Sequence, residues 1–179
     1  MNTWIALFRG INVGGKSLLP MAKLKSGLET LQLSNVRTYI QSGNVAFEST
    51  SKSAAALGKK ISLLVEAQHG FRPQILLLTR ADLLAAVDSN PFPQATSDPK
   101  TLHLFFLAER ALTPDFRALD AKKSPTESHH LTDRVFYLHA PDGVGRSKLA
   151  STAERHLGVI TTARNYRTVE RILGMVASS

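Results

Sequence analysis

Residues 10–17 match a pattern that binds nucleotide phosphates in other proteins. The stretch Gly10-Ile11-Asn12-Val13-Gly14-Gly15-Lys16-Ser17 reads G-x-x-x-x-G-K-S, and it follows the apolar run 4–8, which predicts a buried strand. In such a loop the backbone N–H groups surround the phosphates, and the lysine reaches the terminal one. By itself, the pattern indicates a nucleotide site.

The proline at position 20 argues against a nucleotide-binding loop. In a true loop of this kind the helix begins at the Gly-Lys-Ser end, so that its first N–H groups face the phosphate. A helix that began at Lys16 would need the Pro20 N–H to bond the Lys16 carbonyl, and proline has no N–H. We therefore expect a helix that begins near Pro20, and we interpret the match as a coincidence.

Two interpretations of the glycine-rich loop remain open. Gly10, Gly14 and Gly15 allow backbone conformations that aim successive N–H groups at one point, and such a nest beside Arg9 and Lys16 would hold an anion. The alternative is a tight strand-to-helix connection, in which the glycines serve the shape of the chain alone.

Composition restricts the class of protein. Of the 179 residues, 43% are hydrophobic and 20% are charged, which is typical of a globular chain with a real core. There is no cysteine, which excludes disulfides and thiolate metal sites. The start of the chain lacks a basic signal region, and no segment approaches the roughly 20 apolar residues of a membrane span. We therefore predict a cytoplasmic protein with no membrane partner.

The net charge is +8, and basic residues concentrate near the C-terminus. Residues 146–171 hold six Arg or Lys residues against only Glu154 and Glu170. A basic face attracts phosphates, either in a nucleic acid or on a small molecule. The alternative is a charged surface that only keeps the protein soluble.

The pattern of apolar residues predicts a β-α-β-β-α-β order in the first half of the chain. Proline at position 20 is well placed for the first position of a helix, because its missing N–H would have no partner there. Gln41-Ser42-Gly43-Asn44 separates two short strands, which predicts an antiparallel hairpin. This order is that of the ferredoxin-like unit. Strands are predicted at 4–8, 36–40, 45–47 and 75–78, with one helix beginning near residue 20 and another spanning 53–69.

The second half of the chain runs in a similar order. A short helix through Val87 begins at a capping box, Thr79-Arg80-Ala81-Asp82, and the three prolines of 90–100 indicate a linker. We therefore predict an α+β protein of two tandem ferredoxin-like lobes, 1–89 and 101–179, the second with a C-terminal helix. Its predicted strands are 102–107, 129–131, 135–138 and 159–162, and its predicted helices begin at Thr113-Pro114, span 147–157 and cover 169–176.

Five motifs occur in order along the chain: Arg9-Gly10-Ile11-Asn12-Val13-Gly14-Gly15-Lys16, Tyr39-Ile40-Gln41-Ser42-Gly43-Asn44-Val45, Asn90-Pro91-Phe92, Asp142-Gly143-Val144-Gly145-Arg146-Ser147-Lys148-Leu149 and Thr162-Ala163-Arg164-Asn165-Tyr166-Arg167-Thr168-Val169. Together they resemble the bacterial domain-of-unknown-function family 1697 over essentially the full length. The resemblance implies a two-lobed α+β protein with ferredoxin-like halves and no established activity. Ser17 stands where the family often has asparagine, and Tyr166 where it often has tryptophan. The first of these departures completes the phosphate-loop pattern.

The motifs lie at the ends of elements or in loops, where binding residues concentrate. Arg164 and Asn165 precede the last predicted helix, and 146–148 opens the one before it; helix N-termini carry partial positive charge and free N–H groups. For Ser147 and Asn165 the alternative is ordinary N-capping. We predict an anion-binding site formed by Arg9, Gly10, Asn12, Gly14, Gly15, Lys16, Ser42, Gly43, Asn44, Arg146, Ser147, Lys148, Arg164 and Asn165.

The sequence does not assign catalytic machinery. The motifs hold one acid, Asp142, in an Asp-Gly turn that is favoured for its conformation alone. The six histidines lie outside every motif, and His129 and His130, adjacent on a predicted strand, point to opposite faces. No Ser-His-acid set or metal-ligand spacing occurs, so no metal site is predicted, and catalytic residues and cofactors stay unassigned.

The function we expect is the binding of a small phosphate- or carboxylate-bearing molecule in a cleft between the lobes. One alternative is nucleic-acid binding through the basic C-terminal face, with bases stacking on Tyr39, Phe47, Phe106 and Tyr137. Another is an enzyme that acts on a phosphorylated metabolite held by the same anion site. The sequence leaves the ligand, any reaction and the oligomeric state open.

Overall fold

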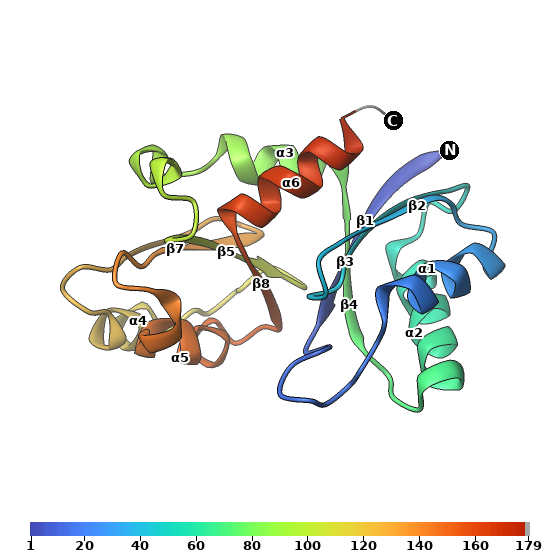
Figure 1. The fold of residues 1–179 in the computed structure, drawn as a ribbon. Coiled ribbons are helices and arrows are strands. Elements are labelled where there is room, and N and C mark those ends of the chain that lie inside the picture. Colours follow the sequence, from blue (N-terminus) through green and yellow to red (C-terminus); the bar gives the residue numbers. More distant parts are fainter. Residues whose placement is uncertain (178–179) are drawn as a thin grey trace. The chain divides into compact units, whose positions relative to one another are not determined.

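The computed structural model describes residues 1–177 and shows an α+β protein (Figure 1). The described residues form two four-stranded antiparallel sheets and six α-helices, which confirms the predicted α+β class. In chain order the elements, including the two 3₁₀ helices η1 and η2, are β1 (Asn2–Arg9), α1 (Met21–Thr30), β2 (Ser34–Tyr39), β3 (Asn44–Ser49), α2 (Ala54–His69), β4 (Gln74–Thr79), α3 (Arg80–Asp88), η1 (Pro93–Ser97), β5 (Leu102–Leu107), α4 (Phe116–Lys122), β6 (Ser128–Leu131), β7 (Val135–His139), η2 (Val144–Arg146), α5 (Lys148–Leu157), β8 (Thr161–Asn165) and α6 (Tyr166–Val176).

The chain divides into two compact units, which we call unit 1 and unit 2. Unit 1 comprises Met1–Ala85 and the residues from Arg171 onward, and unit 2 comprises Ala86–Glu170. Residues 90–100, predicted as a linker, contain η1 and belong to unit 2. Each unit contains one of the two sheets, and in each the strands and helices follow the order β-α-β-β-α-β.

In unit 1 the strands lie in the order β2-β3-β1-β4, and every neighbouring pair is antiparallel. Side chains alternate between the two faces of a strand, and Trp4, Ala6 and Phe8 of β1 belong to a hydrophobic cluster shared with α1 and α2. Ile5 and Leu7, on the opposite face of β1, are also buried. Burial on both faces explains why β1 is a continuous apolar run in the sequence.

In unit 2 the strands lie in the order β6-β7-β5-β8, again antiparallel throughout. Phe105 and Leu107 of β5 share a second hydrophobic cluster with Leu149 and Leu157 of α5. Phe105 also meets Phe136 of β7 edge-on, with ring centroids 5.7 Å apart. We call this face of the sheet, which α4 and α5 cover, the helix face of unit 2.

Side-chain caps define where helices begin. The Ser53 hydroxyl accepts from the Ala56 N–H at 3.2 Å, so α2 starts as predicted. The capping box before α3 is confirmed as well: the Asp82 N–H donates to Thr79 Oγ1 at 3.1 Å, and the Thr79 N–H donates to the Asp82 carboxylate at 2.8 Å. Within residues 1–177, no helix is long and apolar enough to cross a membrane.

Two predicted boundaries in unit 2 are wrong. The helix expected at Thr113-Pro114 begins instead at Phe116, because the Asp115 carboxylate is the acceptor for the first turn. The last strand, expected at 159–162, is Thr161–Asn165. Its position is decided by pairing with β5, a contact between distant segments that no local pattern reveals.

One end of the unit 2 sheet collects several connections. β5 and β6 begin at this end, whereas β7 and β8 end there, since both Leu102 and Ser128 pair with His139. The turn 124–127, which precedes β6, and the connection 142–148, which follows β7, therefore lie at the same end of the sheet.

Candidate functional site

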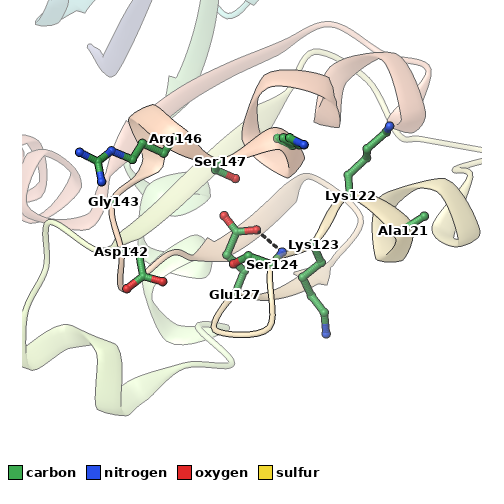
Figure 2. Close-up of a pocket in the computed structure, with 10 residues that line it drawn as sticks. Ala121, Lys122, Lys123, Ser124, Glu127, Asp142, Gly143, Arg146 and Ser147 are labelled. Carbon is green, nitrogen blue, oxygen red and sulfur yellow. Dashed lines mark hydrogen bonds between the residues drawn. The ribbon is translucent and has the colours of Figure 1, made fainter.

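A cavity of about 400 Å³ lies at this end of unit 2 (Figure 2). One wall is the end of α4 with the turn that follows it, and the other is the connection from β7 into α5. The volume is within the range of roughly 300 to 1,000 Å³ that is usual for small-molecule pockets. The residues that line it are Ala121, Lys122, Lys123, Ser124, Glu127, Asp142, Gly143, Arg146, Ser147 and Lys148.

The first wall depends on a turn that its own side chains close. The Glu127 N–H donates to the Ser124 carbonyl at 3.1 Å, and the Ser124 N–H donates to the Glu127 carboxylate at 2.9 Å (Figure 2). Thr126 Oγ1 donates to the Asp142 carboxylate at 2.6 Å. The turn is thus fixed in shape, and Thr126 fastens it to the second wall.

The second wall leads into the N-terminus of α5. Ser147 is the N-cap residue, and its hydroxyl accepts from the Ala150 N–H at 2.9 Å. Gly143 has a φ of +94°, which glycine adopts far more readily than other residues. The first turn of α5 contains no acidic residue, and its other N–H groups have no carbonyl partner within the helix, so this end carries partial positive charge.

Exposed cations surround a buried polar floor. The four cationic residues of the lining are exposed, whereas Glu127 and Ser147 are only 5% and 8% exposed. In Figure 2 the side chains of Lys122, Lys123 and Arg146 extend away from the Glu127 carboxylate. These long side chains keep their charges hydrated and are free to turn toward a bound anion.

The glycine-rich loop of unit 1 does not lead into a helix. α1 begins at Met21, with Pro20 in the N-cap position. Lys16 and Ser17 therefore do not lie at a helix N-terminus. The prediction that the helix begins near Pro20 is confirmed. Without helix N–H groups behind it, the G-x-x-x-x-G-K-S pattern lacks the main element that binds phosphate.

The tip of this loop is a tight turn. Val13 and Lys16 form an isolated β-bridge, in which the Lys16 N–H donates to the Val13 carbonyl at 3.1 Å. Gly14 and Gly15, between them, have φ values of +58° and +72°. Two successive positive φ values are typical of a type I′ turn, whereas an anion-binding nest alternates right- and left-handed residues.

Asn12 and Gly43 join the loop to the β2–β3 hairpin. Asn12 Nδ2 donates to the carbonyls of Leu19 and Gln41 at 3.0 and 2.7 Å, and its Oδ1 accepts from the Leu19 N–H at 2.7 Å. A Cβ atom added at Gly43, whose φ is +75°, would lie 2.6 Å from Phe8 Cβ. The structure therefore brings the first two predicted motifs together, and it gives these two residues a role in holding the backbone.

Other predicted residues of unit 1 also hold neighbouring segments. Asn44 is fully buried, and its Nδ2 donates to the Tyr39 carbonyl at 3.1 Å and to the Ser42 hydroxyl at 3.0 Å. Arg9 donates to Gln74 Oε1, on the adjacent strand β4, at 2.8 Å. Their predicted role in binding an anion stays a prediction.

Arg164 and Asn165 lie outside the cavity lining. Arg164 pairs in register with Leu104, which places it on the sheet face opposite the helix face, and burial lowers its pKa to about 10. Asn165 caps α6, because its Oδ1 accepts from the Thr168 N–H at 2.9 Å. Of the predicted residues in unit 2, the cavity thus includes 146–148 and leaves these two aside.

The sequence predictions missed the first wall. Lys122, Lys123, Ser124 and Glu127 lie outside all five motifs. A signal was present, since adjacent lysines at the end of a helix are followed by the S-x-x-E spacing of a self-closing turn. That signal predicts a turn, but nothing in it predicts that the turn faces the start of α5.

Two histidines lie on the helix face of unit 2, His103 buried and His129 partly buried. His103 and His129 both pair with Leu138 in register, and in the described part of the chain neither Nδ1 atom has a hydrogen-bond partner. Burial lowers the pKa of His103, and a backbone hydrogen bond with Thr101 opposes this shift. His129 Nε2 lies 2.8 Å from Asp120 Oδ1. Among residues 1–177, no group of three His, Cys, Asp or Glu side chains is arranged to hold a metal ion.

The family model for the proteins of unknown function DUF1697 matches residues 1–137. The chain belongs to the DUF1697 family. The match contains the first three motifs and the first wall of the cavity, and it ends before the connection 142–148. A comparison with curated proteins finds no match.

A solved structure of similar fold is that of a conserved bacterial protein from Streptococcus pneumoniae. It is 25% identical to this DUF1697 protein, with a TM-score of 0.72, and the likeness covers 97% of this chain and 98% of that one. Neither the description of the family nor that of the neighbour names an activity.

Proposed function

We propose that this DUF1697 protein binds a small anionic molecule, bearing a phosphate or a carboxylate, in the cavity of unit 2. The observation that carries the proposal is that four exposed cations and the N-terminus of α5 border one cavity. Three of the residues predicted from the sequence, Arg146, Ser147 and Lys148, belong to its lining.

Each of these features attracts negative charge for a separate reason. Ammonium and guanidinium groups form charge-assisted hydrogen bonds to phosphate and carboxylate oxygens, and these are about twice as strong as neutral ones. The helix N-terminus adds roughly 0.3 to 1 kcal/mol for an anion near the first turn. Because the Ser147 hydroxyl is occupied by the Ala150 N–H, Ser147 serves to fix the start of the helix.

The fold and setting are part of the same proposal. The element order β-α-β-β-α-β, with strand orders β2-β3-β1-β4 and β6-β7-β5-β8, supports two ferredoxin-like lobes. Membership of DUF1697 and the neighbour from Streptococcus pneumoniae support a bacterial protein, and a cytoplasmic location stays the prediction from the sequence. A cleft shared by both lobes also stays a prediction.

The substitution Lys148→Ala tests the proposal, because it removes a cation at the first position of α5. Thermal unfolding of the full-length protein is measured with increasing ethyl phosphate. At about 100 times its Kd a ligand stabilises the folded state by about 2.7 kcal/mol, which raises the Tm by roughly 5 °C or more in a chain of this size. Lys148→Ala is expected to weaken binding about tenfold, the effect of losing one charged hydrogen bond.

The matched control is Lys59→Ala, which removes an exposed lysine of α2 in unit 1. It is expected to keep the wild-type response. The absence of any Tm increase in the wild type, or an equal increase in Lys148→Ala, would contradict the proposal. Lys16→Ala is the third variant in this experiment. If it loses the response to ethyl phosphate, the site extends to the glycine-rich loop, as the prediction of a shared cleft requires.

The structure weakens nucleic-acid binding as an alternative. Phe47, Phe106 and Tyr137, three of the four aromatic residues proposed to stack on bases, are at most 2% exposed, and only Tyr39 is partly accessible. Base stacking needs an exposed ring face. An enzyme acting on a phosphorylated metabolite stays an alternative prediction, with no catalytic residue assigned.

A further inference from the structure

The floor of the cavity carries a charge of the opposite sign to its rim. Among residues 1–177, Glu127 is the one acidic residue that is buried, at 5% exposure. The other carboxylate of the lining, Asp142, is exposed and accepts from Thr126 Oγ1. A pocket for a simple anion gains nothing from a buried carboxylate, since like charges in a low-dielectric site repel each other.

The hydrogen bonding of Glu127 is incomplete for a buried carboxylate. One oxygen, Oε2, accepts from the Ser124 N–H at 2.9 Å, and within the described part of the chain no Lys, Arg or His nitrogen lies within 4.0 Å of the group. An ionised carboxylate has about four acceptor sites. In the described part of the chain the other oxygen, Oε1, is not among the fully enclosed polar atoms that lack a partner, so it keeps some contact with the solvent of the cavity. The four cations of the lining do not supply the pairing, because all four are exposed and the side chains of Lys122, Lys123 and Arg146 extend away from the carboxylate in Figure 2.

We propose that the ligand of this cavity is a zwitterion, whose amino group binds the Glu127 carboxylate while its phosphate or carboxylate binds the cations of the rim. This inference rests on the proposed function and deepens it, because it names the class of ligand. A cationic amino group satisfies both the charge and the open acceptor sites of Glu127. The anionic end then meets Lys148 and the N-terminus of α5.

A divalent metal ion is a poorer occupant of the floor. Calcium takes six to eight oxygen ligands, and magnesium keeps several waters beside one or two carboxylates and the phosphates of its substrate. No group of three acidic or histidine side chains suited to a metal occurs among the described residues, and Glu127 is the single carboxylate at the floor. An ammonium group needs only one carboxylate with good geometry.

The experiment compares three probes of nearly equal size: 2-aminoethyl phosphate, 2-hydroxyethyl phosphate and ethyl phosphate. Their affinities for the full-length protein are measured by isothermal titration calorimetry, both without and with EDTA. We expect 2-aminoethyl phosphate to bind about tenfold more tightly than ethyl phosphate, the effect of one charged hydrogen bond. The substitution Glu127→Gln should abolish this preference and leave ethyl phosphate binding equal or stronger.

Glu127→Gln is a mild change, because the glutamine amide keeps an oxygen to accept from the Ser124 N–H. Glu109→Gln, at an exposed position beyond the opposite end of β5, is the matched control and should keep the preference. The probe comparison in the wild type tests the inference even where the variant fails to fold.

The outcomes separate the two proposals. Equal affinities for all three probes in the wild type, or a preference that survives in Glu127→Gln, would overturn the zwitterion while the anion site stands. Equal binding of the amino and hydroxyl probes would overturn the amino group specifically, and so would binding that disappears with EDTA. If no probe binds the wild type, the proposed function itself fails.

Discussion

The glycine-rich loop of unit 1 and the cavity of unit 2 make opposite use of similar chemistry. The loop matches the sequence pattern of a phosphate site, but its tip is a tight turn closed by the hydrogen bond from the Lys16 N–H to the Val13 carbonyl. The cavity matches no such pattern, yet four cations and the start of α5 border it.

The two regions differ in where their backbone donors point. In the loop, Asn12 and the turn hydrogen bonds use the polar groups for folding, and Pro20 delays the helix until Met21. At α5 the serine cap occupies one N–H group, and the remaining ones stay oriented toward the cavity end. Three predictions test whether the loop is structural and whether unit 2 behaves differently.

The largest effect is expected from Gly43→Ala. The new Cβ atom would lie 2.6 Å from Phe8 Cβ at a φ of +75°, so both a clash and backbone strain oppose folding. We expect a loss of about 3 kcal/mol in the free energy of unfolding, measured by urea denaturation and followed by the fluorescence of Trp4, the one tryptophan, which is buried in unit 1.

Gly14→Ala is the matched control for this prediction. Gly14 also has a positive φ, of +58°, but nothing lies within 4 Å of an added Cβ atom. Its cost should therefore be backbone strain alone, about 1 kcal/mol. Equal losses in the two variants would show that the contact between the hairpin and β1 is not what requires glycine at position 43.

A smaller effect is expected from Asn12→Ala. It removes the three hydrogen bonds that join the loop to Leu19 and Gln41, and we expect unfolding to become easier by about 2 kcal/mol in the same fluorescence experiment. The affinity for ethyl phosphate should stay at the wild-type value. A folded variant that had lost this affinity would place Asn12 in the binding site, and the contrast between loop and cavity would fail.

The smallest effect is a dependence of stability on pH through His103. Because burial lowers the pKa of His103 in the folded protein, the unfolded chain takes up a proton first as the pH falls below the ordinary value of 6.5. Stability from this group is complete above pH 6.5 and declines as the pH falls toward the folded-state pKa. Urea denaturation at several pH values should show this decline in the wild type and a weaker one in His103→Gln; identical curves would contradict it.

Local sequence rules predicted most elements and several of their ends. Pro20 predicted the start of the first helix. The hydroxyls of Ser53 and Ser147 cap helices α2 and α5. The capping box of Thr79 and Asp82 marks the start of α3. These signals are readable because each acts within a few residues along the chain.

The candidate site was only half predictable. Arg146, Ser147 and Lys148 came from a motif, whereas Lys122, Lys123 and Glu127 came from a helix end and a turn that no motif contains. The two groups meet because β6 and β7 pair, which brings the residues before one strand next to those after the other. Arg164 was predicted as a site residue but lies outside the cavity lining, because its register opposite Leu104 places it on the other face of the sheet.

The sequence by itself determined the α+β class, the order of the elements and the late start of the first helix, because Pro20 cannot donate the hydrogen bond that a helix beginning at Lys16 requires. Tertiary structure alone decided which polar groups share a surface. Glu127 became the buried floor of a cationic cavity through strand pairing and the turn that its own carboxylate closes. Burial and juxtaposition arise from contacts between distant segments, and such contacts leave no local pattern in the chain.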